Sequence, residues 1–98
     1  MHVFEWDSRK AAANLSKHGV PFAEAASVFA DPEALDGPDL RHSAQEARFL
    51  RLGRSLAGRV LMVAYTHRRS GDAEKIRIIS ARRASRKERD AYGGGAAH

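Results

Sequence analysis

Two adjacent arginines, Arg82 and Arg83, stand where a predicted strand meets a predicted helix. Side chains of a strand alternate between its two faces, so Ile76 and Ile78 are expected to share a face with Arg82 while Arg77 points the other way. The dipole and free N–H groups of the following helix N-terminus also favour an anion. Arg82 and Arg83 are therefore predicted to hold a phosphate.

The alternative for this arginine pair is an ion pair, in which one of the two binds Glu88 or another carboxylate. Further cations extend the basic surface, because Arg86, Lys87 and Arg89 lie on the helix that follows. Arg51 and Arg54, on an earlier strand, are expected to contribute to the same field. For each of these residues, an ordinary solvated surface charge is the competing interpretation.

The five histidines show no spacing typical of a metal site, and cysteine is absent, so neither a bound metal nor another cofactor is expected. His18 ends a predicted helix, where a protonated imidazole is favourable, and is also a candidate general acid or base. His67 and His42 are comparable or weaker candidates. The chain has no phosphate-binding glycine loop and no nucleophile motif, which argues against small-molecule enzymology.

Charge is distributed unevenly along the 98 residues, whose net charge is +5. Residues 1–67 hold eight basic and eight acidic residues, whereas residues 68–98 hold nine and four. Of the 17 basic residues 13 are arginine, whose planar fork suits phosphate. A polyanionic partner is the natural expectation. No window approaches the roughly 20 apolar residues of a membrane span, and the absence of cysteine is compatible with the cytoplasm.

The N-terminal third is expected to hold a short strand and two helices. The strand runs from His2 to Trp6, and Asp7 has the chemistry of an N-cap for a helix from Ser8 to His18. A second helix starts at Pro21 and ends at Asp31-Pro32, with its apolar side chains at helical spacing on Phe22, Ala25, Ala26 and Phe29.

The remainder reads as a sheet followed by one helix. A short edge strand is expected at residues 34–36, and three strands at 47–54, 59–67 and 75–82 should form an antiparallel meander. Ser85 and Glu88 have the spacing of a capping box for a last helix ending near Tyr92. The prediction is an α+β domain over residues 1–92, with helices packed on one face of the antiparallel sheet, and a flexible tail over 93–98.

Two separated groups of residues resemble the BrnT toxin family over residues 3–92. The first comprises Phe4-Glu5-Trp6-Asp7, Lys10, Asn14, Lys17-His18-Gly19-Val20, Phe22, Glu24-Ala25 and Val28-Phe29. The second comprises Glu46, Arg48-Phe49, Gly53, Leu61, Tyr65, Ile76 to Ala84, Glu88-Arg89 and Tyr92. Their occurrence in the right order makes the resemblance specific.

The resemblance implies a RelE-like fold and a type II toxin that acts as a metal-independent endoribonuclease and halts translation in the cytoplasm. It also implies a BrnA-like antitoxin with a ribbon-helix-helix DNA-binding part, in a heterotetramer or larger complex. That complex would repress its own operon, so DNA contact would come through the antitoxin. No membrane partner is expected.

Metal-free RNA cleavage needs a proton acceptor, cations for the phosphorane charge and a proton donor. We expect Arg82 and Arg83 to stabilise charge, with Arg77 and Lys17 in secondary roles. His18, His67 and Glu24 stay open as bases, and Tyr92 as a residue that positions a nucleobase or donates a proton.

Two other functions fit the same residues. A non-catalytic module would use the basic face only to bind nucleic acid or a partner, with a steep dependence on salt. A degenerate toxin would keep only the role of co-repressor beside its antitoxin.

Overall fold

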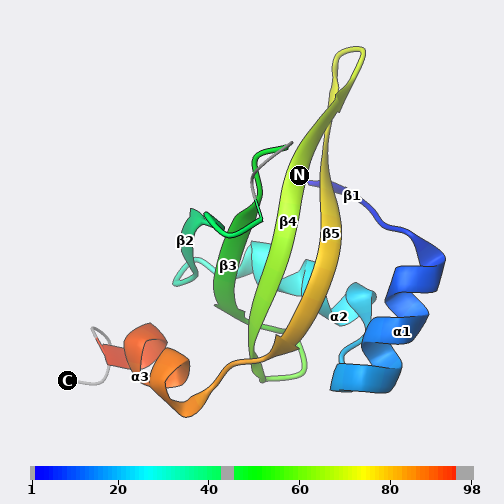
Figure 1. Cartoon of the computed structure of the whole chain (residues 1–98). Helices are drawn as coiled ribbons and strands as arrows, with labels where there is room; N and C mark the ends of the chain where they lie inside the picture. The colour runs from blue at the N-terminus through cyan, green and yellow to red at the C-terminus, as the bar shows by residue number, and fades with distance from the viewer. Residues whose placement is uncertain (1, 43–45, 95–98) are drawn as a thin grey trace.

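The computed structural model describes residues 2–42 and 46–94, which form a five-stranded sheet with three α-helices (Figure 1). In chain order the elements are β1 (Val3–Glu5), α1 (Ser8–His18), α2 (Phe22–Ser27), the 3₁₀ turn η1 (Val28–Ala30), β2 (Leu35–Pro38), β3 (Phe49–Arg54), β4 (Val60–Ser70), β5 (Ala73–Arg83) and α3 (Arg86–Gly94). The strands lie in the order β1-β5-β4-β3-β2. The predicted α+β class and the order of elements are confirmed.

The sheet is mixed and not wholly antiparallel. The predicted meander is present as β3, β4 and β5, and β2 pairs with β3 at one edge, all antiparallel. At the other edge β1 lies parallel to β5. The alternation of apolar and polar residues predicts a strand but not the strand with which it pairs. The parallel pairing of β1 with β5 was therefore not predicted.

Helix α1 has the predicted limits because both of its ends are capped. The Asp7 carboxylate accepts from the N–H groups of Arg9 and Lys10, at 2.8 and 3.2 Å. At the other end Gly19 adopts φ 70°, and its N–H donates to the Leu15 carbonyl. The left-handed conformation at this position favours glycine.

The hydrophobic core lies between the sheet and the helices α1 and α2. Fully buried residues include Val20 and Val28 from the helical layer and Leu61, Val63 and Ile78 from β4 and β5. Burying each such side chain contributes roughly 1.5–3 kcal/mol. On helix α1, Asn14 is buried against this core, while Leu15 is half exposed.

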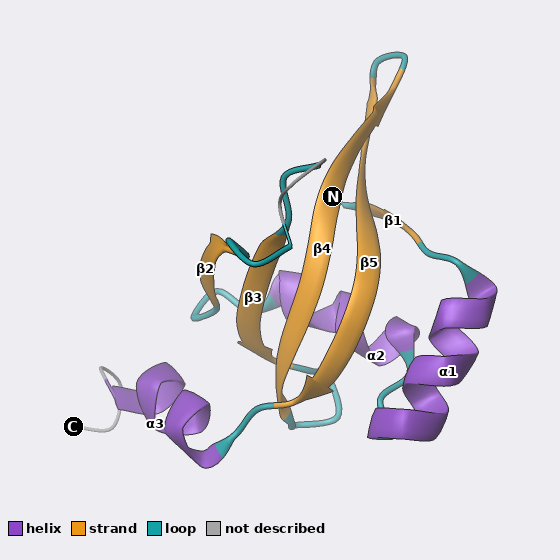
Figure 2. Cartoon of the chain, viewed as in Figure 1, coloured by secondary structure: helices purple, strands orange, loops and turns teal. Residues whose placement is uncertain are grey.

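Helix α3 does not share the helix-covered face, which corrects the expectation that all helices pack there. It lies beyond the end of the sheet, as Figure 2 shows. Its Tyr92 hydroxyl donates to Asp31 at 2.6 Å, and the Arg54 N–H donates to the same carboxylate oxygen at 2.7 Å. No helix of residues 2–42 or 46–94 therefore covers the face of the sheet opposite α1 and α2, which we call the open face.

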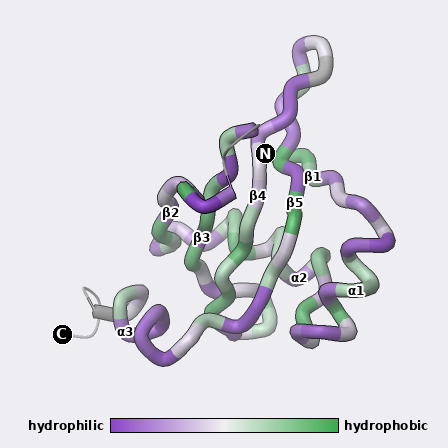
Figure 3. Tube along the Cα trace, viewed as in Figure 1, coloured by the Kyte–Doolittle hydropathy of each residue, from purple (hydrophilic) through white to green (hydrophobic). Residues whose placement is uncertain are grey.

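The open face is bordered by hydrophilic segments at both ends of the molecule. Figure 3 shows hydrophilic chain at the start of α3 and near the tip of the β4–β5 hairpin. Of the predicted tail 93–98, Gly93 and Gly94 belong to α3 and the rest lies outside the described residues. No helix within 2–42 or 46–94 is long and apolar enough to cross a bilayer.

Candidate active site

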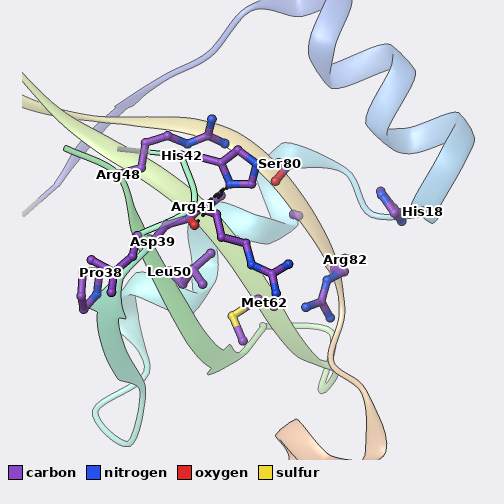
Figure 4. Close-up of a pocket in the computed structure, with 13 residues that line it drawn as sticks. His18, Pro38, Asp39, Arg41, His42, Arg48, Leu50, Met62, Ser80 and Arg82 are labelled. Atoms are coloured by element: carbon purple, nitrogen blue, oxygen red, sulfur yellow. Dashed lines mark hydrogen bonds and ion pairs between the residues drawn. The ribbon is translucent and has the colours of Figure 1, made fainter. Parts of the chain in front are cut away.

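A cleft of about 640 Å³ lies on the open face (Figure 4). Its floor comes from β3, β4 and β5, one wall from the segment after β2, and the far end from the last residue of α1. The lining residues are His18, Pro38, Asp39, Leu40, Arg41, His42, Arg48, Leu50, Met62, Ala64, Ser80, Ala81 and Arg82.

An irregularity in β5 brings Arg82 to this cleft. Tyr65 on β4 pairs with Ile78, but its neighbour Ala64 pairs with Ser80, so Ile79 is an extra residue. One extra residue reverses the alternation beyond it. Arg82 therefore lies on the open face, opposite the core-facing Ile76 and Ile78, and the predicted shared face is wrong.

The Arg82 guanidinium is held by Glu88, the ion pair that the sequence left as an alternative. Nη1 and Nη2 donate to the two Glu88 carboxylate oxygens at 2.7 and 2.9 Å, and Nη1 also donates to the Arg83 carbonyl at 3.3 Å. These hydrogen bonds lower the Glu88 pKa to about 2 and raise the pKa of Arg82. Arg82 stays charged and fixed in orientation.

The ion pair with Glu88 leaves some N–H groups of the Arg82 guanidinium available to bind another group. A guanidinium has five N–H groups, and the bonds within the described chain use three of Arg82's. The remaining two, on Nε and Nη2, lie along one edge in the parallel arrangement that binds phosphate oxygens. The predicted phosphate-binding role of Arg82 is therefore compatible with its ion pair.

Asp39 and His42 form a second polar group in the cleft. Nδ1 of His42 lies 3.1 Å from Oδ2 of Asp39, which is only 8% exposed, whereas the His42 side chain is 57% exposed. A carboxylate can only accept, so in the neutral imidazole this contact favours the tautomer with its proton on Nδ1 and its lone pair on Nε2. This arrangement presents an oriented imidazole that can accept a proton.

Two further arginines line the same cleft. In Figure 4 the Arg41 side chain extends past Met62 toward Arg82, and Arg48 lies on the other side of His42. Arg41 is exposed and Arg48 is half-buried. The cleft therefore concentrates positive charge around the imidazole.

His18 reaches the far end of the cleft because Asn14 anchors α1 to β5. The buried Asn14 amide donates to the carbonyls of Val20 and Ala81 at 3.0 and 2.8 Å and accepts from the Ala81 N–H at 3.1 Å. In Figure 4 His18 and His42 lie on either side of Arg82. Lys17, one residue before His18, is exposed.

Arg77 lies in a second hollow of about 370 Å³ on the open face. This hollow shares His42 and Arg48 with the first cleft, and Lys10 also lines it. Nη1 of Arg77 donates to Glu5 at 3.0 Å. Arg77 is thus beside the cleft but is not brought together with Arg82.

Arg51 and Glu24 have partners that give them structural roles. Arg51 lies on the helix-covered face, where it donates to the Val28 and Asp31 carbonyls and to Asp36 at 3.1, 3.3 and 2.6 Å. Glu24 accepts two hydrogen bonds from Arg59, which lower its pKa and make it a poor base. Neither residue lines the cleft.

His67 also lies apart from the cleft, on the helix-covered face of β4. Its imidazole contacts the rings of Phe49 and Tyr65, and Nδ1 lies 3.3 Å from Glu74. The open-face cleft therefore contains His18 and His42 but not His67.

Arg83 is separated from Arg82, because consecutive strand residues face opposite ways. It lines a third cleft, between the end of the sheet and α3, together with Arg54, Arg89 and Tyr92. The other two basic residues of α3, Arg86 and Lys87, are exposed. The adjacent arginines predicted to bind one phosphate thus serve two separate clefts.

Sequence reasoning named His42 only as a weaker acid–base candidate, and it missed the contribution of Asp39, Arg41 and Arg48 to the cleft. The segment from Asp39 to His42 lies in a polar stretch without periodicity, so nothing indicated that it folds over the sheet. The i, i+3 spacing of Asp39 and His42 was the available signal, but it becomes informative only once a turn is known. Among the described residues, no three His, Asp or Glu side chains gather as metal ligands.

Comparisons with known proteins bear on family and fold separately. The model of a family described as the ribonuclease toxin BrnT of type II toxin-antitoxin systems matches residues 6–88. The crystal structure of the Brucella abortus ribonuclease toxin BrnT is similar, with a TM-score of 0.63 and 24% identity, covering 88% of this chain and 100% of that one. No curated protein sequence matches. Because the two sequences are only 24% identical, this structural similarity is evidence for a shared fold and not for shared site residues.

Proposed function

The chain belongs to the BrnT family of ribonuclease toxins of type II toxin-antitoxin systems, and we propose that it cleaves RNA in the open-face cleft without a metal ion. The observation that carries this proposal is one cleft holding both an imidazole oriented by a buried carboxylate and an arginine with a free phosphate-binding edge. An imidazole base and a cation are two of the three groups that metal-free phosphodiester cleavage requires, the third being a proton donor.

In the proposed reaction the ribose 2′-hydroxyl attacks the adjacent phosphorus. Nε2 of His42 takes the hydroxyl proton as the 2′-oxygen forms its bond to phosphorus. The bond from phosphorus to the 5′-oxygen then breaks, and that oxygen receives a proton. The products are a 2′,3′-cyclic phosphate and a 5′-hydroxyl end, so atoms and charge balance without water or metal.

Arg82 supports this reaction by binding the phosphate oxygens on which charge develops. Glu88 fixes the guanidinium before substrate arrives, so little reorganisation is needed in the transition state. Arg41 and Arg48 add positive charge on the His42 side. One preorganised donor of this kind contributes roughly 10²–10³ in rate.

His18 is the proposed donor of the proton to the leaving 5′-oxygen. In-line displacement places the entering and leaving oxygens on opposite sides of phosphorus, and His42 and His18 flank Arg82 in the cleft. Arg77 and Lys17 have secondary roles in this proposal: Arg77 contacts the phosphate of a neighbouring nucleotide, and Lys17 adds to the field near His18.

At the level of the cell, the type II family implies an antitoxin partner. We extend this to a BrnA-like ribbon-helix-helix antitoxin that covers the toxin and represses the operon with it. Cytoplasmic RNA cleavage that halts translation is the proposed toxic effect. We further propose that residues 1–92 act as a single RelE-like domain.

The test uses an RNA with one cleavable site, incubated with the protein in excess EDTA. Cleavage to a cyclic phosphate and a 5′-hydroxyl is expected, and a single 2′-deoxy substitution at that site should block it. Loss of cleavage in EDTA, or cleavage of the 2′-deoxy RNA, would overturn the mechanism. If neither RNA is cleaved but the antitoxin complex still binds its operator, the chain is a co-repressor only.

A further inference from the structure

The cleft between the end of the sheet and α3 has the chemistry of a second nucleic-acid site. Its volume is about 420 Å³, and its lining includes four arginines and one tyrosine. The described residues that line it, none of them a carboxylate, are Arg54, Gly58, Arg59, Val60, Arg83, Ala84, Arg89, Tyr92 and Gly93. A cleft lined by one sign of charge raises the local concentration of a polyanion.

Two carboxylates beside the cleft compensate part of this positive charge. Arg59 pairs with Glu24, and Asp31 accepts from the Arg54 N–H and the Tyr92 hydroxyl, so the four charges are reduced to a net of two. Arg54 and Arg89 donate to the carbonyls of Gly58 and Ala84, and these neutral partners leave the arginine charges in place. Arg83 makes no ion pair within the described residues. Its charge acts on Glu24 only at longer range and helps to lower the pKa of that carboxyl.

Tyr92 adds a surface on which a nucleobase can stack. Its hydroxyl is tied to Asp31, and the Arg54 guanidinium lies 5.6 Å from the ring centroid. The hydrogen bond fixes the ring, while burial and the bond to Asp31 raise the pKa of its hydroxyl, so the ring stays neutral. Aromatic rings beside arginines bind successive bases of single strands with little sequence preference.

The two clefts meet at consecutive residues. Arg82 lines the open-face cleft and Arg83 lines the second one, on opposite sides of β5. A strand whose scissile phosphate is bound by Arg82 can therefore continue past the end of β5 onto Arg83. We propose that the cleft beside α3 binds the single-stranded RNA that flanks the cleavage site, and so favours long unpaired RNA over short fragments.

This inference rests on the proposed function, and equilibrium binding separates the two. The probes are a 12-nucleotide and a 3-nucleotide RNA, each 2′-deoxy at the cleavable position, with affinity measured by fluorescence anisotropy. Arg83→Gln is the variant, and Arg69→Gln, on the β4–β5 hairpin, is the charge-matched control. Thermal unfolding followed by circular dichroism verifies that each variant folds.

Arg83→Gln is expected to weaken binding of the long RNA about fivefold more than binding of the short one, with the salt slope for the long RNA falling by about 0.7. Equal weakening for both lengths would place Arg83 at the scissile phosphate and overturn the proposal. No weakening, or the same change in Arg69→Gln, would also overturn it. Because the probes cannot be cleaved, these results hold whether or not the protein is a nuclease.

Discussion

Single side chains of the open-face cleft show which of its lining residues could be named from the sequence and which could not. Arg82 was predictable because it lies in a patterned strand beside a capping box, and its partner Glu88 occupies the capping position. His42 was only one of several candidate histidines and Asp39 was not named, because a polar segment between strands carries no periodic signal that would place them in a cleft. Arg51 was expected to extend the basic surface because of its charge. In the structure its side chain instead donates to groups within the fold.

His42 gives the first residue-scale prediction. His42→Gln should lower the rate of the chemical step by about 10²–10⁴, because the cleft loses its proton acceptor. Single-turnover cleavage at saturating protein measures this step. His67→Gln is the matched control, since it removes a histidine that also faces a carboxylate but lies outside the cleft. Equal rates for His42→Gln and the wild type would exclude His42 as the base.

Glu88 gives a prediction on pH. Its pKa is about 2 in the folded protein against an ordinary 4.5, so its ion pair stabilises the fold above pH 4.5 and ceases to do so as the pH falls toward 2. The free energy of unfolding of the wild type should therefore fall between pH 4.5 and 2 more than that of Glu88→Gln. Urea denaturation at several pH values measures the difference, and parallel curves would contradict the assignment.

At the scale of elements, the sequence predicted the caps and limits of helices and strands well. It predicted less well which face of the sheet a side chain occupies and which elements lie side by side. The N-cap at Asp7 and the capping box at Ser85 are local signals, and both are confirmed. The face of Arg82 was wrong because the extra residue Ile79 depends on pairing with β4, which a strand does not reveal by itself. The parallel pairing of β1 and the position of α3 were not predicted either, because both depend on contacts with other elements.

Asn14 gives the prediction at this scale, because three buried hydrogen bonds join α1 to β5 through its side chain. Asn14→Ala should destabilise the fold by about 2–4 kcal/mol, since backbone groups of Val20 and Ala81 lose buried partners. Chemical denaturation measures the change. The control is Ser16→Ala, at an exposed position of the same helix, with an expected change within about 0.5 kcal/mol. A similarly small change in Asn14→Ala would contradict the anchoring role.

At the scale of the whole molecule, the basic residues that are concentrated in the last third of the sequence line separate clefts. The basic last third supplies Arg77 and Arg82 to the open face, and Arg83 and Arg89 to the cleft beside α3. The net charge predicted a polyanionic partner, but it did not show that α1 and α2 cover one face of the sheet and leave the open face as the proposed site for RNA. That division follows from long-range packing, which composition does not encode.

Substitution of Arg82 examines whether the open-face cleft is the site of RNA cleavage, as proposed. The measurement is single-turnover cleavage of one RNA by the wild type, Arg82→Ala and Arg69→Ala, with folding verified by thermal unfolding. Arg82→Ala should be slower by roughly 10²–10³, because a preorganised donor to the transition state is lost. Arg69→Ala, which removes the same charge on the β4–β5 hairpin, should cleave at the wild-type rate. Cleavage by Arg82→Ala at the rate of Arg69→Ala would mean that RNA is not cleaved in the open-face cleft.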